Sequence, residues 1–480
     1  MVPAAVRETH VSTLFFVGDR VYKLKKPVAL DFVDLSTRAA RERMCRREVE
    51  LNRRLAPDVY LGVAEVLGTD GESCDHLVVM RRMPDDRRLS TMVEAQDDVS
   101  ACIRNVARAI AGFHARADQP PAHSAAGAIE TVREHWESNF ATMEPFVGPV
   151  LDPEVAERVA DRARRYLAGR AELFSHRIET GKVRDGHGDL LADDIFCLDD
   201  GPRILDCLEF DDDLRYGDVL ADVAFLAMDL ERLEAPALAV QFLGWYAEFS
   251  AETYPMTLAH HYIAYRAHIR SKVACLRAAQ GDGTAAATAV RLLALTDDHL
   301  RRGRVTLTLV GGLPGTGKST LASELAHQLG WTVLRSDEVR KDLAGIAHTQ
   351  HREGPYGQGL YAQAITDATY DALLDRTRSL LAFGEPVILD ASWSTERWRE
   401  AARHIAHTAA AELVELRCEA PKEMMRARLE SRAARGDDAS DATSAIADRM
   451  AASVDPWPGA RTIDTSSSRD AATACALAAL

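Results

Sequence analysis

The sequence predicts an α+β domain over residues 1–300, followed by an α/β domain with a parallel sheet over residues 304–480. After about residue 300, strand-like and helix-like patterns alternate, which is typical of βαβ units. The first half instead opens on β-rich runs and continues with long helical patterns. A predicted helix over 285–301 ends at Gly303, a residue type that commonly terminates helices, and we expect the domain boundary there.

The composition indicates a globular protein of the cytoplasm. Among the 480 residues, 47% are apolar and 27% are charged, which are ordinary values for a soluble protein. No apolar run approaches the ~18 residues of a membrane span, and the first ten residues lack the apolar core of a signal peptide. The eight cysteines form no C-x-x-C pair, which favours reduced thiols.

The charge distribution argues against nucleic acid as a partner. The net charge is −15, of which −4 falls in residues 304–480 and −11 in the remainder. Nucleic-acid-binding proteins usually carry a basic patch, whereas both parts of this chain are acidic. We therefore expect a small molecule as the substrate, and the sequence does not indicate the oligomeric state.

The firmest functional signal is Gly312–Ser319, which reads G-x-x-x-x-G-K-S and lies between a strand pattern over 304–311 and a helical pattern over 320–329. This is the phosphate-binding P-loop in its expected context. Glycines let successive N–H groups point at phosphate oxygens, while the lysine reaches the β/γ-phosphates and the serine binds Mg²⁺. The predicted ATP-binding residues here are Gly312, Gly315, Thr316, Gly317, Lys318, Ser319 and Thr320, with Ser319 also a metal ligand.

Two further strands of the second half are predicted to end in acidic residues. Ligands of open α/β sheets lie beyond the carboxyl ends of the strands. Asp337 follows a strand over 331–336, so it can act as the general base on an acceptor hydroxyl, although a helix N-cap is the simpler alternative. Arg340, one turn further, is a candidate for an acceptor anion. Asp390 ends a strand over 386–390, where a Walker B carboxylate binds Mg²⁺.

Arginines are concentrated between residues 424 and 441, next to a glycine and several aspartates. We interpret this segment as an Arg-rich lid that closes over the phosphates, with a solvated basic helix face as the alternative. Arg428 and Arg432 are four residues apart and share one helix face, so we predict that Arg428 binds the nucleotide and that Arg432 is catalytic. The lid arginines are Arg426, Arg428, Arg432 and Arg435.

In these motifs, residues 304–480 resemble small P-loop kinases of the gluconate kinase, chloramphenicol phosphotransferase and polynucleotide-kinase-like group. The resemblance rests on the P-loop, Asp337, Asp390 and the lid arginines. It implies transfer of the γ-phosphoryl group of ATP to a hydroxyl and does not name the acceptor.

The first half carries a second set of kinase-like residues. A predicted hairpin over 9–24 contains Lys23, and a charged helix over 38–55 contains Glu48, about 25 residues later. Kinases use a strand lysine paired with a helical glutamate to hold the α/β-phosphates of ATP. The pair is a weak signal alone, because a strand lysine is most often a surface residue.

The stretch 184–198 strengthens this interpretation. It contains His187-Gly188-Asp189 and then Asp194, and a strand-like run that contains Asp206 follows it. In a kinase site Asp189 would be the catalytic base, and Asp194 and Asp206 would bind Mg²⁺ through oxygen, the ligand atom that this ion prefers. An acidic surface loop is the alternative.

With these residues, roughly 8–300 resembles the aminoglycoside phosphotransferase-like kinases, as found in a bacterial family that fuses such a domain to a P-loop kinase-like domain. The resemblance implies a bilobal protein-kinase-like fold with ATP between the lobes. Three positions depart from the pattern: Asp194 replaces an asparagine, Leu191 replaces a histidine, and Ser12-Thr13 stand in for a glycine-rich loop. In the resemblance, Asp218 and Asp222 support the catalytic loop, although helix capping explains them equally well.

Three functions follow from these patterns. The leading hypothesis is an ATP- and Mg²⁺-dependent kinase that acts on a hydroxylated small molecule at the P-loop site. The first half would carry a second, kinase-like site, and its departures from the family pattern are compatible with weak activity there. One alternative is a nucleic-acid end kinase or toxin-like kinase. Another is a non-catalytic ATP-sensing regulator with a pseudokinase half.

Overall fold

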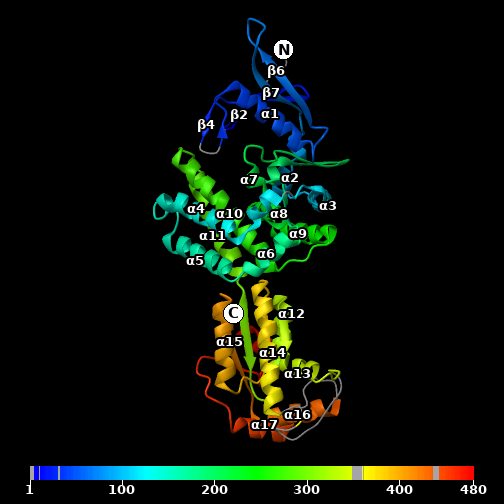
Figure 1. Ribbon diagram of the computed structural model, residues 1–480, viewed down its shortest axis with the longest axis vertical. Helices are drawn as coiled ribbons and strands as arrows, with labels where there is room; N and C mark the ends of the chain where they lie inside the picture. The colour runs from blue at the N-terminus through cyan, green and yellow to red at the C-terminus, as the bar shows by residue number, and fades with distance from the viewer. Residues whose placement is uncertain are drawn as a thin grey trace. The chain divides into compact units, whose positions relative to one another are not determined.

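The computed structural model describes residues 5–9, 11–30, 33–119, 121–348, 359, 362–435 and 443–480 (Figure 1). Within these ranges no helix is long and apolar enough to cross a membrane. The chain forms two compact units. The first comprises Met1–Val159, Phe174–Tyr254 and Ala259–His299, and the second comprises Ala160–Leu173, Pro255–Leu258 and Leu300–Leu480.

A five-stranded antiparallel sheet opens the first unit, in the order β1-β2-β3-β7-β6. Its strands are β1 (Ala5–Glu8), β2 (Ser12–Val17), β3 (Arg20–Lys25), β6 (Tyr60–Leu67) and β7 (Ser73–Arg81). Helix α1 (Arg38–Asn52) packs on it, because Cys45, Val49 and Asn52 recur at helical spacing and are buried. Glu48 lies on the same buried face and is thereby brought under β3.

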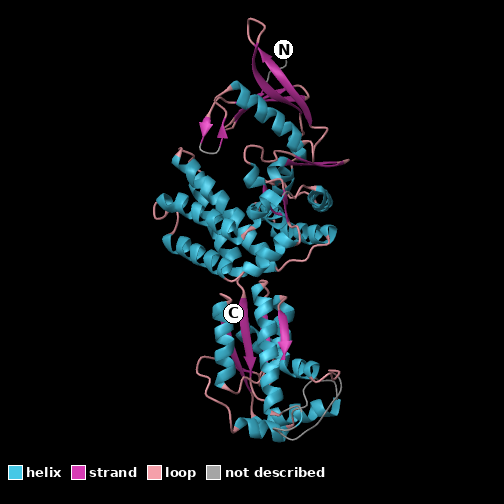
Figure 2. Ribbon diagram, viewed as in Figure 1, coloured by secondary structure: helices cyan, strands magenta, loops and turns pink. Residues whose placement is uncertain are grey.

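The rest of the first unit is mostly helical (Figure 2). Its central helix α8 (Val219–Arg232) is buried along nearly its whole length, so it forms the core on which the surrounding helices pack. Two short hairpins, β9–β10 and β8–β11, flank the loop that follows Asp185. The other elements of the first half are β4 (Ala29–Leu30), β5 (Val33–Asp34), α2 (Leu89–Glu94), α3 (Ser100–Arg116), α4 (Ile129–Met143), α5 (Pro153–Ala168), α6 (Ala171–Glu179), β8 (Val183–Asp185), β9 (Ile195–Leu198), β10 (Gly201–Ile204), α7 (Asp212–Arg215), β11 (Tyr216–Asp218), α9 (Pro236–Ser250), α10 (Met256–Ala279) and α11 (Ala285–Arg302).

The second unit contains a five-stranded parallel sheet in the order β13-β14-β12-β15-β16, which confirms the predicted α/β class. The central strand β12 is buried at every position, as expected of a strand covered on both faces. The elements are β12 (Thr306–Gly311), α12 (Lys318–Leu329), β13 (Thr332–Arg335), α13 (Ser336–Leu343), α14 (Gln363–Ala382), β14 (Val387–Asp390), α15 (Glu396–Thr408), β15 (Glu412–Glu419), α16 (Lys422–Arg435), α17 (Ser444–Ala451), β16 (Arg461–Asp464) and α18 (Arg469–Leu477).

One predicted strand of this unit differs from the structure at its end. The strand predicted over 331–336 ends at Arg335, because Ser336 already begins α13. Asp337 therefore lies in the first turn of that helix and is not its N-cap.

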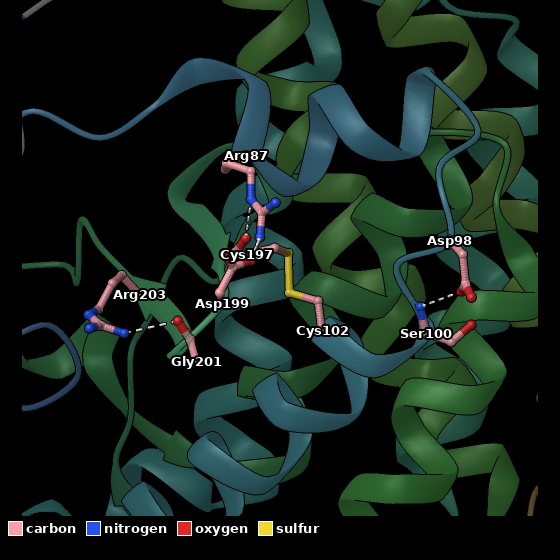
Figure 3. The surroundings of a disulfide bond; sticks show 8 residues. All are labelled: Arg87, Asp98, Ser100, Cys102, Cys197, Asp199, Gly201 and Arg203. Carbon is pink, nitrogen blue, oxygen red and sulfur yellow. Dashed lines mark hydrogen bonds and ion pairs between the residues drawn. A yellow bond between two sulfur atoms is a disulfide. The ribbon is translucent and has the colours of Figure 1, made fainter.

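The expectation of reduced thiols is wrong for two of the cysteines. Cys102 of α3 and Cys197 of β9 form a disulfide with a Cα–Cα distance of 5.7 Å, and Arg87 Nε donates to the carbonyl of Cys197 at 2.7 Å (Figure 3). No sequence pattern indicates this pair, because 95 positions separate the two residues and no short spacing motif links them. The other six cysteines are free.

We expect the denatured, unreduced protein to titrate six thiols, and eight after reduction. The variant Cys102→Ser should titrate seven because Cys197 loses its partner, whereas the control Cys74→Ser should titrate five. Closing a loop of this length stabilises a fold by roughly 4–5 kcal/mol in the chain-entropy account, so reduction should also lower the melting temperature. Eight thiols before reduction would contradict the disulfide.

Candidate active sites

The first candidate site is centred on Lys23 of β3. Its Nζ lies 2.8 Å from Glu48 Oε1 and 2.8 Å from Asp206 Oδ1, so the structure brings together three residues that are far apart in the sequence. Burial disfavours the lysine charge, but the carboxylates of Asp206 and Glu48 outweigh it and raise the pKa of Lys23 well above its ordinary value. Lys23 is therefore a fixed cation at this site.

Glu48 is completely buried and serves two lysines. Its Oε2 lies 2.6 Å from Lys25 Nζ, and Lys25 also donates to Glu209 at 2.6 Å. Lys23 and Lys25 are two positions apart on one strand and so project from the same face. Lys25 was not among the predicted site residues. The i, i+2 spacing along β3 was the sequence signal that could have identified it.

The turn His187-Gly188-Asp189 is held by a buried carboxylate. Asp222 of α8 accepts from the backbone N–H groups of His187 and Gly188, both at 2.8 Å, and its Oδ2 lies 3.0 Å from His114 Nε2. Asp222 therefore supports the turn that carries the predicted base. Asp218, by contrast, caps α8 through Leu220 N–H and pairs with Arg177.

The three acidic residues of the predicted site differ in their electrostatics. Burial raises the pKa of Asp189 to about 6. Burial and then the neighbouring carboxylates of Asp206 and Asp189 raise the pKa of Asp194 well above its ordinary value. Lys23 lowers the pKa of Asp206. A half-buried aspartate with a pKa near 6 is suited to accept a proton at neutral pH.

Asp194 and Asp206 fit a Mg²⁺ ion. Leu205, the neighbour of Asp206, donates its N–H to the carbonyl of Asp194 at 2.9 Å, and the Asp206 carboxylate is one cause of the raised pKa of Asp194. A divalent cation would offset the repulsion between these carboxylates. Mg²⁺ is commonly held by one or two carboxylates and completed by phosphate oxygens and water. The part of the chain that the structure describes contains no cluster of three or more His, Cys, Asp or Glu side chains able to hold a metal alone.

The predicted stand-in for a glycine-rich loop lies at the turn between β1 and β2. Ser12 N–H donates to Thr9 Oγ1 at 3.0 Å, and Thr9 Oγ1 donates to the carbonyl of Ser12 at 3.2 Å. Ser12 itself is fully buried at the start of β2. These bonds give the turn a fixed shape without the glycines of the usual loop.

The second candidate site is the P-loop between β12 and α12. Gly312, Gly315 and Gly317 have φ values of 145°, 85° and 88°, which favour glycine. A Cβ at Gly312 would also lie 2.6 Å from Thr316 Oγ1, and one at Gly315 would lie 2.7 Å from the carbonyl of Met425. Helix α12 begins at Lys318, so its N-terminal N–H groups face the loop, and Lys318 and Ser319 are half-buried there.

Thr465 and Arg428 fasten the P-loop to neighbouring elements. The hydroxyl of Thr465, just after β16, donates to the carbonyl of Thr316 at 2.5 Å. Arg428 of α16 donates to the carbonyl of Thr465 at 2.6 Å and to that of Gly315 at 3.4 Å. Thr465 was not among the predicted residues, since a lone threonine after a strand carries no motif.

The strand ends place one predicted acidic residue beside the strand that leads into the P-loop. Asp390 ends β14 and is paired in register with Val310 of β12, just before the loop. Arg335 Nε lies 3.3 Å from Asp390 Oδ2, whereas Asp390 Oδ1 is buried and has no hydrogen-bond partner among the described residues. An orphaned carboxylate oxygen at this strand end fits Mg²⁺. Asp337, at the start of α13, is ion-paired with Arg340 and does not line the P-loop cavity described below.

A cavity of about 520 Å³ lies along the P-loop, between it and α16. Arg428 and Arg432 both line it, together with Lys318, Ser319 and Thr320. The predicted arginine pair and P-loop thus share one cavity. The lid itself stays a prediction, because residues 436–442 and the side chain of Arg435 lie outside the described part, and Arg426 instead pairs with Asp448 at 3.1 Å.

Comparison with known proteins assigns a family to each half. A family model described as "Phosphotransferase enzyme family" matches residues 18–259, and one described as "AAA domain" matches residues 307–457. An uncharacterized protein of Mycobacterium tuberculosis is 42% identical over 465 residues, which cover 97% of this chain and 93% of the relative. An uncharacterized protein of Mycobacterium bovis matches equally well.

Solved structures are similar to one half or the other. The GDP and kanamycin complex of the aminoglycoside phosphotransferase APH(2")-IIia is 17% identical, with a TM-score of 0.40, and the match covers 62% of this chain and 93% of that one. A gluconokinase from Sinorhizobium meliloti 1021 is 16% identical, with a TM-score of 0.27, over 36% and 90% of the two chains.

The family matches and the sheet topologies agree about both halves of the protein. Strands β3, β6 and β7 with Lys23 and the buried Glu48 lie in the part matched by the first model, and strands β13, β14 and β15 with the P-loop lie in the part matched by the second. The chain therefore belongs to the phosphotransferase enzyme family, with a protein-kinase-like first half joined to a P-loop kinase-like second half.

Proposed function

We propose that the protein is a cytoplasmic kinase that transfers the γ-phosphoryl group of ATP to a hydroxyl of a small molecule. The observation that carries the proposal is the P-loop, whose glycine conformations are those of a phosphate-binding loop and whose lysine and serine line one cavity, while the neighbouring strand β14 ends in an aspartate oxygen that is buried and has no hydrogen-bond partner among the described residues. We assign the two activities to residues 1–300 and 304–480. The acidic charge of both parts favours a small acceptor over nucleic acid.

At the P-loop site, the backbone N–H groups and Lys318 bind the β- and γ-phosphates. Asp337 accepts the proton of the acceptor hydroxyl, and its ion pair with Arg340 orients it. Arg432, on the wall of the cavity along the P-loop, offsets charge on the transferred group. Ser319 and Asp390 would hold Mg²⁺, which neutralises phosphate charge when bound.

In the first half, Lys23 binds the α/β-phosphates and Glu48 orients it. Asp194 and Asp206 would hold Mg²⁺, and Asp189 removes the proton of a second acceptor hydroxyl. The buried ion pair between Lys23 and Glu48 supports an active site over a pseudokinase, because kinases hold the phosphate-binding lysine in this way.

The variant Lys318→Ala should reduce turnover at the P-loop site at least about a hundredfold, since it removes a fixed positive charge from the phosphates. ATP consumption by the full chain in a screen of sugars, nucleosides and aminoglycosides measures this, in the Asp189→Asn background that silences the first-half site. The exposed Lys422, at the start of α16, provides the control variant Lys422→Ala, which should keep wild-type turnover. Unchanged turnover in Lys318→Ala would refute the assignment.

The variant Asp390→Asn should raise the Mg²⁺ concentration for half-maximal turnover about tenfold or more, because the ligand loses its charge and keeps its shape. Titration of Mg²⁺ at saturating ATP measures the change. Glu400→Gln, at an exposed position of α15, is the control for removing one negative charge. The same Mg²⁺ dependence in both variants would exclude Asp390 as a ligand.

Activity of the first-half site should fall as the pH drops through about 6. Asp189 must be ionised to accept a proton, so below its pKa the kcat/KM should decrease about tenfold per pH unit. The profile is measured in the Lys318→Ala background, which silences the other site. Asp189→Asn should abolish the remaining turnover, and a flat profile between pH 5 and 7, or activity in Asp189→Asn, would argue against this base.

A further inference from the structure

A cavity of about 540 Å³ adjoins the predicted base of the first unit. Gly188 and Asp189 form part of its wall, so a molecule bound there can present a hydroxyl to the carboxylate. Most of the remaining wall is apolar or aromatic and comes from α4, α8 and α10. Such a wall fits the carbon skeleton of a ligand and leaves a few polar groups to set its orientation. The aromatic residues of the wall are Phe210, Tyr216, Phe225, Tyr262 and Tyr265.

Three cationic residues of α10 also line this cavity, and one of them has a structural role. Arg266 donates through Nε to the carbonyl of Ala221 at 2.9 Å, and its guanidinium lies 4.3 Å from the ring centre of Phe225. These contacts hold Arg266 against α8. The other two cations, Arg270 and Lys272, are one turn or more further along the same helix.

Neither Arg270 nor Lys272 forms an ion pair with a carboxylate among the residues that the structure describes, although the charge of Arg270 acts on Asp189 and opposes the rise in the pKa of that carboxyl. Arg270 is half-buried and makes no hydrogen bond or ion pair within that set, and Lys272 Nζ donates at 2.5 Å to the neutral side-chain oxygen of Asn139. Burial lowers the pKa of Lys272, which shows that its charge is poorly compensated.

The other carboxylates of the wall are engaged elsewhere. Asp218 is ion-paired with Arg177, and the exposed Asp213 lies 3.4 Å from His123 Nδ1. A partly buried cation without a counter-charge is unfavourable, so a negatively charged ligand group would stabilise both side chains. A cationic ligand would instead meet three positive charges in a mostly apolar wall.

We propose that the acceptor of the first-half site is an amphipathic anion: an apolar, preferably aromatic, body that carries a hydroxyl near Asp189 and a carboxylate or phosphate near Arg270 and Lys272. The inference rests on the proposed function of this site, because it assumes that the cavity beside Asp189 holds the acceptor. It goes further by assigning the charge and the carbon skeleton of that acceptor.

The test uses the full-length Lys318→Ala protein and matched derivatives of benzyl alcohol. The para substituent is a carboxylate, a phosphonate, a neutral carboxamide or a cationic aminomethyl group. Calorimetry in the presence of ADP measures the Kd of each compound, and transfer of labelled phosphate from ATP is followed in parallel. A charge-assisted bond predicts that the carboxylate or the phosphonate binds about tenfold or more tightly than the carboxamide, with the aminomethyl compound weakest.

Arg270→Gln and Lys272→Gln should each remove most of this preference without weakening carboxamide binding. Arg277→Gln is the matched control on α10, because Arg277 is exposed and pairs with Asp282 at 2.5 Å. Equal or tighter binding of the carboxamide or amine overturns the inference, as does no anion binding at about 10 mM, well above the range expected of a fragment. Anion-selective binding without Asp189-dependent phosphoryl transfer would leave the inference standing and refute the proposed catalysis at this site.

Discussion

Glu48 carries a charge that water does not reach, and the first unit is built to compensate it. A buried carboxylate is tolerated only when cations and hydrogen bonds replace its lost hydration. Lys23 and Lys25 supply both, and each lysine is in turn shared with a second carboxylate, Asp206 or Glu209. The packing of α1 on its sheet and the position of the phosphate-binding lysine thus depend on one another. These alternating lysine and carboxylate ion pairs join α1 and β3 to the segment that carries Asp206 and Glu209.

The same constraint distinguishes structural charges from functional ones. Asp222 is compensated by two backbone N–H groups and a histidine, so its role is complete within the protein. Among the described residues, by contrast, Asp390 Oδ1 is buried without a hydrogen-bond partner, and Arg270 and Lys272 form no ion pair with a carboxylate. Groups of this kind are stabilised when a ligand of opposite charge arrives. The second unit therefore favours a cation beside Asp390, and the cavity beside Asp189 in the first unit favours an anion.

Site residues could be predicted from the sequence where a short, local motif marks them. The P-loop has a fixed spacing, and parallel strands place their carboxyl ends together, so Lys318, Ser319 and Asp390 were predicted from short segments and lie near one another. Contacts between distant segments were harder to predict. Asp222, which only the family resemblance indicated in advance, holds a turn 35 positions earlier in the sequence, Thr465 reaches the P-loop from 149 positions away, and Cys102 pairs across 95 positions. Thr465 and Cys102 belong to no motif, because their roles depend on how separate elements pack.

The two halves meet the same chemical demand by different means. In the second unit, backbone N–H groups and a helix N-terminus surround the phosphates, and this requires glycines at φ values that other residues rarely adopt. In the first unit the corresponding turn between β1 and β2 lacks such glycines, so fixed side-chain charges have to contribute more of the phosphate-binding energy. The pairing of Lys23 with two carboxylates fits that requirement, because a lysine held from two sides is already positioned before ATP arrives. The departure from a glycine-rich loop is therefore compatible with phosphate binding, provided that the ion cluster around Glu48 stays intact.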